Sequence, residues 1–232
     1  MLKAYNISIF FRCFLSLCIS CNTSNDSIYK DIDNNTSRAD FFKFKIPIYQ
    51  SGPQKGKADW IYDYIRKQTS DLKLDTLQSG FKDIQIRIWL QNWLAIKKDL
   101  IILSRTNYQW TGELITMTYK YNDSLQEHLI VKKETKQVFP YSGWDNFFKS
   151  LLNLKILTLR DMNELPNYEV GDDGTDFVFE IATPNKYRMF HYWQPSLFLD
   201  KYWEAKNVTL IAKLLEKELL FSTPSRFLSI SK

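Results

Sequence analysis

The sequence predicts an α+β fold in which antiparallel β-hairpins form one sheet and a few helices pack against it, all in a single domain. Two observations indicate the hairpins: segments with alternating apolar residues occur in pairs, and a short turn joins the members of each pair. A third observation indicates helices, because apolar residues recur at helical spacing in other segments. Strands and helices do not alternate regularly, which argues against a doubly wound parallel sheet.

The first half of the domain is predicted to hold most of the strands. Apolar residues alternate from Phe42 to Ile48, and Pro47 places this strand at a sheet edge. A short helix is expected over residues 59–68, where apolar residues have helical spacing. Further strands are expected over residues 84–91 and over residues 99–105, and the second of these is expected to be buried on both faces. Two more strands, residues 108–121 and 125–134, are expected to form a hairpin around the turn Asn122-Asp123-Ser124.

The second half adds helices and another hairpin. A helix is expected from Trp144 to Leu152, with Ser142 and Asp145 able to cap its first turn. The other expected elements are a helical patch over residues 159–165, a hairpin of residues 177–181 and 187–193 around a turn at residues 183–186, and a helix over residues 208–221 with Asn207 as its cap.

All three cysteines lie near the start of the chain, at Cys13, Cys18 and Cys21. A secreted domain stabilised by disulfides would spread its cysteines through the fold. The same region has basic residues at Lys3 and Arg12 and a short apolar stretch over residues 13–20, which is too short to span a bilayer. The order of these parts is typical of a targeting peptide.

Leu17-Cys18-Ile19-Ser20-Cys21 resembles the lipobox of bacterial lipoproteins, in which a small residue precedes the cysteine that is lipidated. Ser20 fits the small position, although Cys18 stands where that family usually has leucine. The resemblance implies cleavage before Cys21 and attachment of lipid to Cys21. The alternative is that this region is a strand or helix of the core, but a polar run follows it at once.

This organisation predicts three parts: a lipoprotein signal peptide over residues 1–20, the lipidated Cys21 with a polar tether over residues 21–40, and an α+β domain over residues 41–232. The expected location is the bacterial cell envelope, with the domain outside the cytoplasm and attached to a membrane by its lipid. The net charge of +5 is dispersed along the chain, without the basic clusters of a nucleic-acid surface, so we expect no nucleic acid as a partner.

The sequence offers few metal or cofactor ligands. After Cys21 there is no cysteine, and the only histidines are His128 and His191, which disfavours zinc sites built from these residue types. The run from Gly171 to Asp176 places Asp172, Asp173 and Asp176 close together, as calcium would require. A tight turn needs the same residue types, and we favour the turn. No metal and no cofactor are expected.

Glu180 and His191 form a second candidate constellation. If Pro184-Asn185 is the centre of a short turn, Glu180 lies opposite Met189, and His191 follows on the same face. A carboxylate near an imidazole is the beginning of an acid/base site. The alternative is a cross-strand polar contact on a partly solvated face, which we favour.

Aromatic residues make up 16% of the chain and include seven tryptophans. Trp110, Trp193 and Trp203 lie near predicted strand ends or turns and are candidates for stacking on a ligand, whereas Trp144 heads an apolar helical stripe. Filling of the core is the alternative role for each ring, and we favour it.

A longer pattern, Gly171-x-Asp173-Gly174-Thr175-x-Phe177-x-Phe179-Glu180 followed by Tyr187 and Trp193-x-Pro195, resembles one found in small uncharacterised bacterial secreted proteins and lipoproteins. The resemblance implies an envelope protein and assigns no activity. It also suggests that Glu180 and Tyr187 belong to one hairpin.

Two functions remain open. The favoured one is a non-enzymatic envelope lipoprotein that binds an unknown protein or small ligand. The alternative is an envelope hydrolase in which Glu180 acts with Asp173 or Asp176. The two carboxylates of such an enzyme would face one pocket, about 5–10 Å apart.

Overall fold

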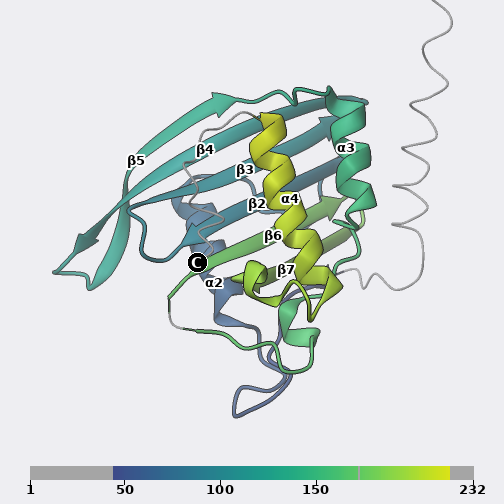
Figure 1. Ribbon diagram of the computed structural model, residues 1–232. Helices are drawn as coiled ribbons and strands as arrows, with labels where there is room; N and C mark the ends of the chain where they lie inside the picture. The colour runs from purple at the N-terminus through teal and green to yellow at the C-terminus, as the bar shows by residue number, and fades with distance from the viewer. Residues whose placement is uncertain (1–43, 172, 220–232) are drawn as a thin grey trace, which may run out of the picture. The chain divides into compact units, whose positions relative to one another are not determined.

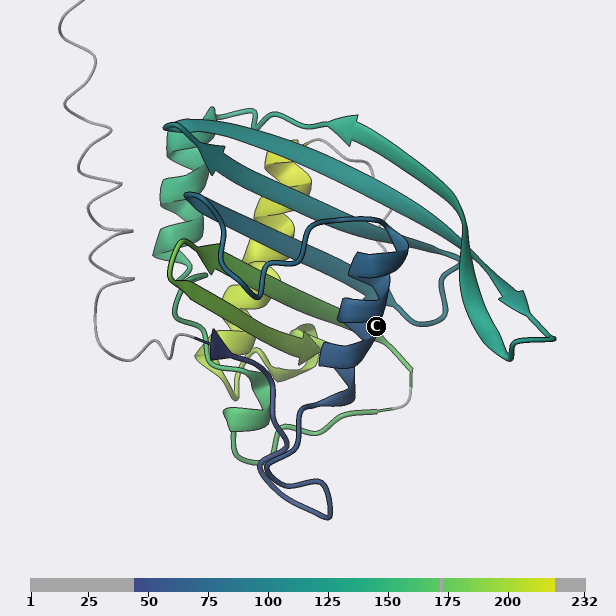
Figure 2. The same ribbon diagram turned by 180° about the vertical axis from the view of Figure 1, so that it is seen from behind.

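The computed structural model describes residues 44–171 and 173–219, all of which belong to one compact unit, Ala39–Lys232. Its α+β architecture confirms the predicted class: one seven-stranded sheet with three α-helices (Figures 1 and 2). The predictions for Cys21, the tether and Asp172 lie outside the described residues. Within the described part of the chain, no helix is long and apolar enough to span a membrane.

The sheet has the strand order β1-β7-β6-β2-β3-β4-β5. All pairs are antiparallel except β1 with β7. The strands are β1 (Phe44–Lys45), β2 (Ile84–Asn92), β3 (Lys97–Thr106), β4 (Gln109–Asn122), β5 (Glu127–Gln137), β6 (Thr175–Thr183) and β7 (Lys186–Trp193). Both predicted hairpins, β4–β5 and β6–β7, are confirmed.

Helices cover both faces of the sheet. Helices α3 (Trp144–Asn153) and α4 (Trp203–Leu219) lie across one face, visible in the foreground of Figure 1. Helix α2 (Trp60–Asp71) lies on the opposite face, seen in Figure 2. Two 3₁₀ helices, η1 (Met162–Glu164) and η2 (Pro195–Phe198), lie in the connections.

The first predicted strand ends earlier than expected, at Lys45. In the described part of the chain, Phe44 and Lys45 form β1, which pairs in parallel with β7 at the edge of the sheet. Pro47 follows β1, and its carbonyl accepts a hydrogen bond from the N–H of Asp59 at 3.0 Å. The chain therefore leaves the sheet at the proline, which confirms the predicted edge position.

The predicted start of the helix at Trp144 is confirmed, but its predicted caps and two other helix predictions are wrong. Helix α3 begins after Gly143, whose φ of 81° suits glycine, and neither Ser142 nor Asp145 caps it. Helix α4 begins at Trp203, so Asn207 lies inside it and donates to the carbonyl of Leu154 at 3.1 Å. Within residues 159–165, only the single turn η1 is helical. Asp161 is the N-cap of this turn, and Pro166, shortly after it, disfavours a longer helix.

The two faces of the sheet differ in chemistry because successive side chains of a strand point to opposite faces. The face toward α3 and α4 is mainly apolar, as in the buried Ile86 and Ile88 of β2 and Phe177 and Phe179 of β6. The face toward α2 combines an apolar cluster with buried polar side chains. The polar members, placed by strand alternation, are Gln85, Arg87, Gln91, Lys98, Asp176, Glu180 and His191.

Candidate functional site

The candidate residues Asp176, Glu180 and His191 all lie on the α2 face of the sheet. Their exposed fractions are 3%, 4% and 2%. The prediction that Glu180 and His191 share a face is therefore consistent with the strand alternation, and Glu180 pairs with Met189 as predicted. The expected partial solvation is wrong, because α2 and the segment that follows it cover this face. Buried charges need compensating partners, so the contacts of these three side chains decide their roles.

Glu180 lies at a pocket of about 440 Å³. The pocket is formed between the second half of α2 and the segment after it, with Glu180 contributed by β6. Its lining is Arg66, Thr69, Ser70, Leu74, Asp75, Thr76, Leu77, Gln78 and Glu180. Most of these side chains offer hydrogen-bond acceptors, and the two carboxylates outnumber the single guanidinium. The pocket therefore suits a ligand that carries positive charge and hydrogen-bond donors.

Two neutral donors fix the carboxylate of Glu180. The indole Nε1 of Trp89 donates to Oε2 at 2.8 Å, and the hydroxyl of Tyr187 donates to Oε1 at 2.8 Å. Burial, followed by the charge and hydrogen bond of Glu180, raises the pKa of Tyr187 well above its usual value, so the tyrosine remains a donor. Each carboxylate oxygen accepts a second hydrogen bond readily. The suggestion that Glu180 and Tyr187 share a hairpin is confirmed.

Arg87 lies directly opposite Glu180 on the neighbouring strand β2. Its Nε donates to Oε1 of Gln85 at 2.9 Å, and its Nη2 donates to the carbonyl of Asp75 at 2.7 Å. The third nitrogen, Nη1, is buried without a hydrogen-bond partner. Burial lowers the pKa of Arg87, partly offset by the charge of Glu180. Yet no basic nitrogen among the described residues lies within ion-pair distance, 4.0 Å, of the Glu180 carboxylate.

His191 belongs to a separate network of buried carboxylates. Asp161 accepts from the backbone N–H of His191 at 2.8 Å and lies 3.0 Å from its Nδ1. Nε2 of His191 is 3.9 Å from Asp59, which accepts from Nδ2 of Asn163 at 2.7 Å. Burial opposes protonation, but the charge and hydrogen bond of Asp161, with the charges of Asp59 and Asp176, raise the pKa of His191 to about 9. The imidazolium thus links the caps of α2 and η1.

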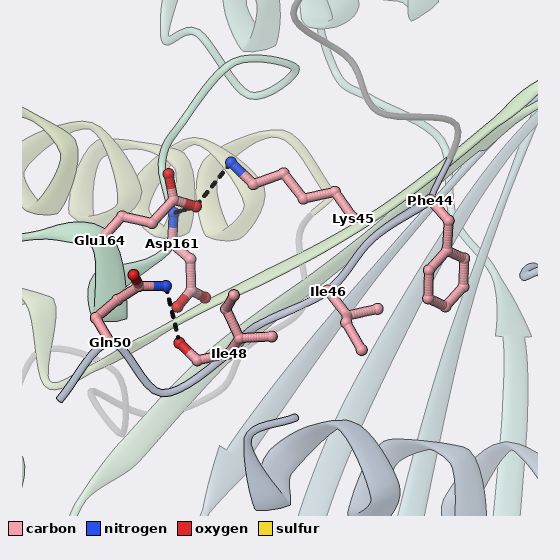
Figure 3. Close-up of a pocket in the computed structure, with 7 residues that line it drawn as sticks. All are labelled: Phe44, Lys45, Ile46, Ile48, Gln50, Asp161 and Glu164. Atoms are coloured by element: carbon pink, nitrogen blue, oxygen red, sulfur yellow. Dashed lines mark hydrogen bonds and ion pairs between the residues drawn. The ribbon is translucent and has the colours of Figure 1, made fainter. Parts of the chain in front are cut away.

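A second pocket, of about 400 Å³, lies beside Asp161 (Figure 3). Its charged side chains already have partners within the protein. Lys45 and Glu164 form an ion pair at 2.7 Å, and Asp161 is held by His191 and Asn163. Phe44 and Ile48 add apolar surface to the lining. Because these charges compensate one another, we place the candidate ligand site over Glu180 instead.

Gly171 and Gly174 both lie close to the ring of Trp193. A Cβ atom at Gly171 would lie 2.7 Å from Cζ2 of that ring, and one at Gly174 would lie 2.7 Å from its Nε1. The indole Nε1 donates to the carbonyl of Asp173 at 3.2 Å. Asp176 lies in β6 and accepts from Nε1 of Trp93 at 2.5 Å, so it is a strand residue and does not serve the turn.

We expect Gly171→Ala to lower the free energy of unfolding by about 1–3 kcal/mol, because the added methyl group overlaps the Trp193 ring. Urea denaturation would measure the change. The same substitution in a Trp193→Leu background should cost much less, since the overlapping ring atoms are gone. An equal cost in both backgrounds would contradict the contact.

The candidate tryptophans have different roles. Trp110 is 8% exposed, and its ring centroid lies 4.3 Å from that of Phe148 on α3, which places it in the core. Trp193 lies against Gly171 and Gly174, and Trp203 is 51% exposed at the start of α4. The sequence interpretation missed Trp89, whose spacing in an alternating strand gave no sign that its indole would bind a carboxylate.

Sequence reasoning also missed Lys98, which lies within a group of aromatic rings. Its Nζ donates to the hydroxyl of Tyr64 at 3.0 Å and lies 4.2 Å from the ring centroid of Trp93 and 5.0 Å from that of Tyr119. Burial lowers the pKa of Lys98 to about 8, with the charge of Asp176 opposing the change. Cation–π contacts and one hydrogen bond therefore stabilise this ammonium group.

Among the described residues, no group of three or more His, Cys, Asp or Glu side chains is arranged to hold a metal ion. Comparisons of the chain with protein-family models, with curated proteins and with solved structures find no match.

Proposed function

We propose that the chain is a bacterial envelope lipoprotein whose domain, residues 41–232, binds a small cationic ligand in the pocket over Glu180. One observation carries the ligand proposal. The Glu180 carboxylate is buried at a pocket and fixed by Trp89 and Tyr187, both neutral donors, while no described basic nitrogen forms an ion pair with it.

A buried carboxylate is costly unless a charge or several hydrogen bonds compensate it. The two neutral donors orient Glu180 and leave acceptor capacity on both oxygens. An ammonium group that enters the pocket supplies an ion-pair partner for Glu180 and up to three donors. Hydroxyls of Thr69, Ser70 and Thr76 line the same pocket and can accept the remaining N–H groups.

A binding role fits the contacts of the carboxylates better than the alternative of a hydrolase. That enzyme needs Glu180 and a second carboxylate at one bond. Here Glu180 is held by Trp89 and Tyr187, whereas Asp176 is held by Trp93. Asp173 contributes its backbone carbonyl to Trp193. We therefore propose a non-enzymatic domain.

The ligand proposal is tested by thermal unfolding of the purified full chain with butylammonium, and with butanol as the uncharged control. A ligand that binds only the folded state at a hundredfold excess over its Kd stabilises it by about 2.7 kcal/mol. We expect butylammonium to raise the melting temperature and butanol to have no comparable effect. Glu180→Gln should abolish the rise, whereas Asp63→Asn, an exposed carboxylate outside the pocket, should preserve it. A rise that survives Glu180→Gln would contradict the proposal.

The envelope location is supported by the order of parts at the start of the chain: basic residues, a short apolar stretch, Ser20, Cys21 and then a polar run. A single acyl chain gives only marginal attachment to a membrane, at about 0.8 kcal/mol per buried methylene. Bacterial lipoproteins, which this segment resembles, carry several chains, so firm attachment is expected.

We expect Cys21→Ser to leave the chain uncleaved or to release it from the membrane fraction, while Cys18→Ser changes neither. Mass spectrometry of the wild-type N-terminus measures this directly. An unmodified Cys21, or a mature chain that retains Met1, would contradict the lipoprotein proposal.

A further inference from the structure

We infer that the ligand of the Glu180 pocket carries a carboxylate next to its ammonium group, as α-amino acids do, and that Arg87 binds this carboxylate. The inference rests on the proposed function, because it extends the ligand from the group at Glu180 to its neighbour. The inference is drawn from two buried groups of opposite charge, Glu180 and Arg87, which lie opposite each other without forming an ion pair.

Glu180 and Arg87 are direct partners in the β6–β2 register and lie on the same face of the sheet. Side chains at such positions have Cβ atoms about 4.5–5.5 Å apart, close enough for an ion pair. Each group is instead directed to other partners: Glu180 to Trp89 and Tyr187, and Arg87 to Gln85 and the Asp75 carbonyl. The protein thus holds two opposite charges near each other without direct contact between them.

The guanidinium of Arg87 has one unused donor. Nη1 is buried and has no hydrogen-bond partner, which destabilises the folded protein. Its companion Nη2, bonded to the same carbon atom, donates to Asp75, which lines the pocket. The guanidinium therefore contacts a residue of the pocket lining, although Arg87 itself does not line the pocket. A carboxylate is the natural acceptor for a guanidinium, which can bind it through two parallel hydrogen bonds.

An α-amino acid fits this pair because its ammonium and carboxylate groups are attached to the same carbon atom. With the ammonium at Glu180, a carboxylate on the same carbon atom can extend toward Arg87, which lies opposite Glu180 on the neighbouring strand. Arg87 does not line the pocket in the ligand-free protein, so binding of the carboxylate requires the segment from Leu74 to Gln78 to shift. Leu74 and Leu77 supply apolar lining for a short aliphatic side chain.

The test compares three matched ligands: L-norvaline, butylammonium, which is norvaline without its carboxylate, and pentanoate, which is norvaline without its amino group. Dissociation constants are measured by calorimetry on the full chain, as the wild type, Glu180→Gln and Arg87→Met. We expect norvaline to bind about tenfold more tightly than butylammonium, or more, and pentanoate to bind weakest. A ratio of ten corresponds to about 1.4 kcal/mol.

In Arg87→Met, the preference for norvaline over butylammonium should fall to nearly one while butylammonium still binds. If this variant does not fold, Arg87→Lys, which lacks the planar fork, should also reduce the preference. Equal affinities in the wild type would overturn the inference and leave the Glu180 site intact. A preference that persists without Arg87 would overturn the role of Arg87. Failure of both amines to bind would overturn the proposed function together with the inference.

Discussion

Replacing Asp161 with alanine is expected to lower the free energy of unfolding by about 3–5 kcal/mol, the usual cost of removing one partner of a buried ion pair. Asp161 accepts hydrogen bonds from the backbone N–H groups of His191 and Asn163 and contacts Nδ1 of His191. Its loss uncaps η1 and leaves the buried imidazolium without its closest anion. Urea denaturation of the variant and the wild type measures the difference.

Two variants distinguish this network from a general effect of charge. Asp63→Ala removes a carboxylate that is 76% exposed in the first turn of α2, and we expect a change of less than about 1 kcal/mol. Asp161→Asn retains an oxygen for capping and should cost less than alanine. A loss below 1 kcal/mol for Asp161→Ala would show that His191 is not held by this carboxylate.

Stability should fall by about 2 kcal/mol between pH 6 and pH 8, because His191 remains protonated in the folded protein after it has lost its proton in the unfolded chain. The folded pKa of about 9 lies above the ordinary value of 6.5. Its stabilising contribution is therefore fully present below pH 6.5 and is lost as the pH rises through 9. The groups that face His191 are Asp161, Asp59 and Asp176, from η1, α2 and β6.

The range below pH 8 isolates this effect. The pKa of Lys98 is lowered to about 8 by burial, so above that pH its titration adds a contribution of opposite sign. Urea denaturation at pH 6, 7 and 8 is the measurement. Substitution of the exposed His128 by Gln should leave the slope unchanged, whereas His191→Gln should remove it. A wild-type stability that is constant across this range would contradict a charged His191.

Local sequence signals predicted the strands and hairpins well. The turn at Pro184-Asn185 set the β6–β7 register, and the pairing of Glu180 with Met189 follows from it. The helix starts were less predictable. Asn207 has the composition of a cap, but the chain enters α4 earlier because Phe198 accepts from the N–H of Tyr202 and continues the turn.

The chemistry of the α2 face was not predictable from local patterns. In β2 the polar residues Gln85 and Arg87 alternate with isoleucines, which is typical of a solvated face, yet the structure buries both faces. Helix α2 covers this face of the sheet, and its packing depends on contacts between residues that are distant in sequence. Trp89 is 91 residues from Glu180, and Asp161 is 30 residues from His191. The cap position of Asp161 before η1 was the one local signal that was available.

The pocket over Glu180 is proposed as the ligand site. A titration with butylammonium, followed by the amide chemical shifts of the protein, locates the bound ligand directly. We expect the largest shift changes at Thr69 and Ser70 on α2, in the segment from Leu74 to Gln78, and at Glu180. Glu180→Gln should remove them. Changes confined to Phe44–Lys45 and Glu164, around the second pocket, or an absence of any saturable change, would contradict the claim.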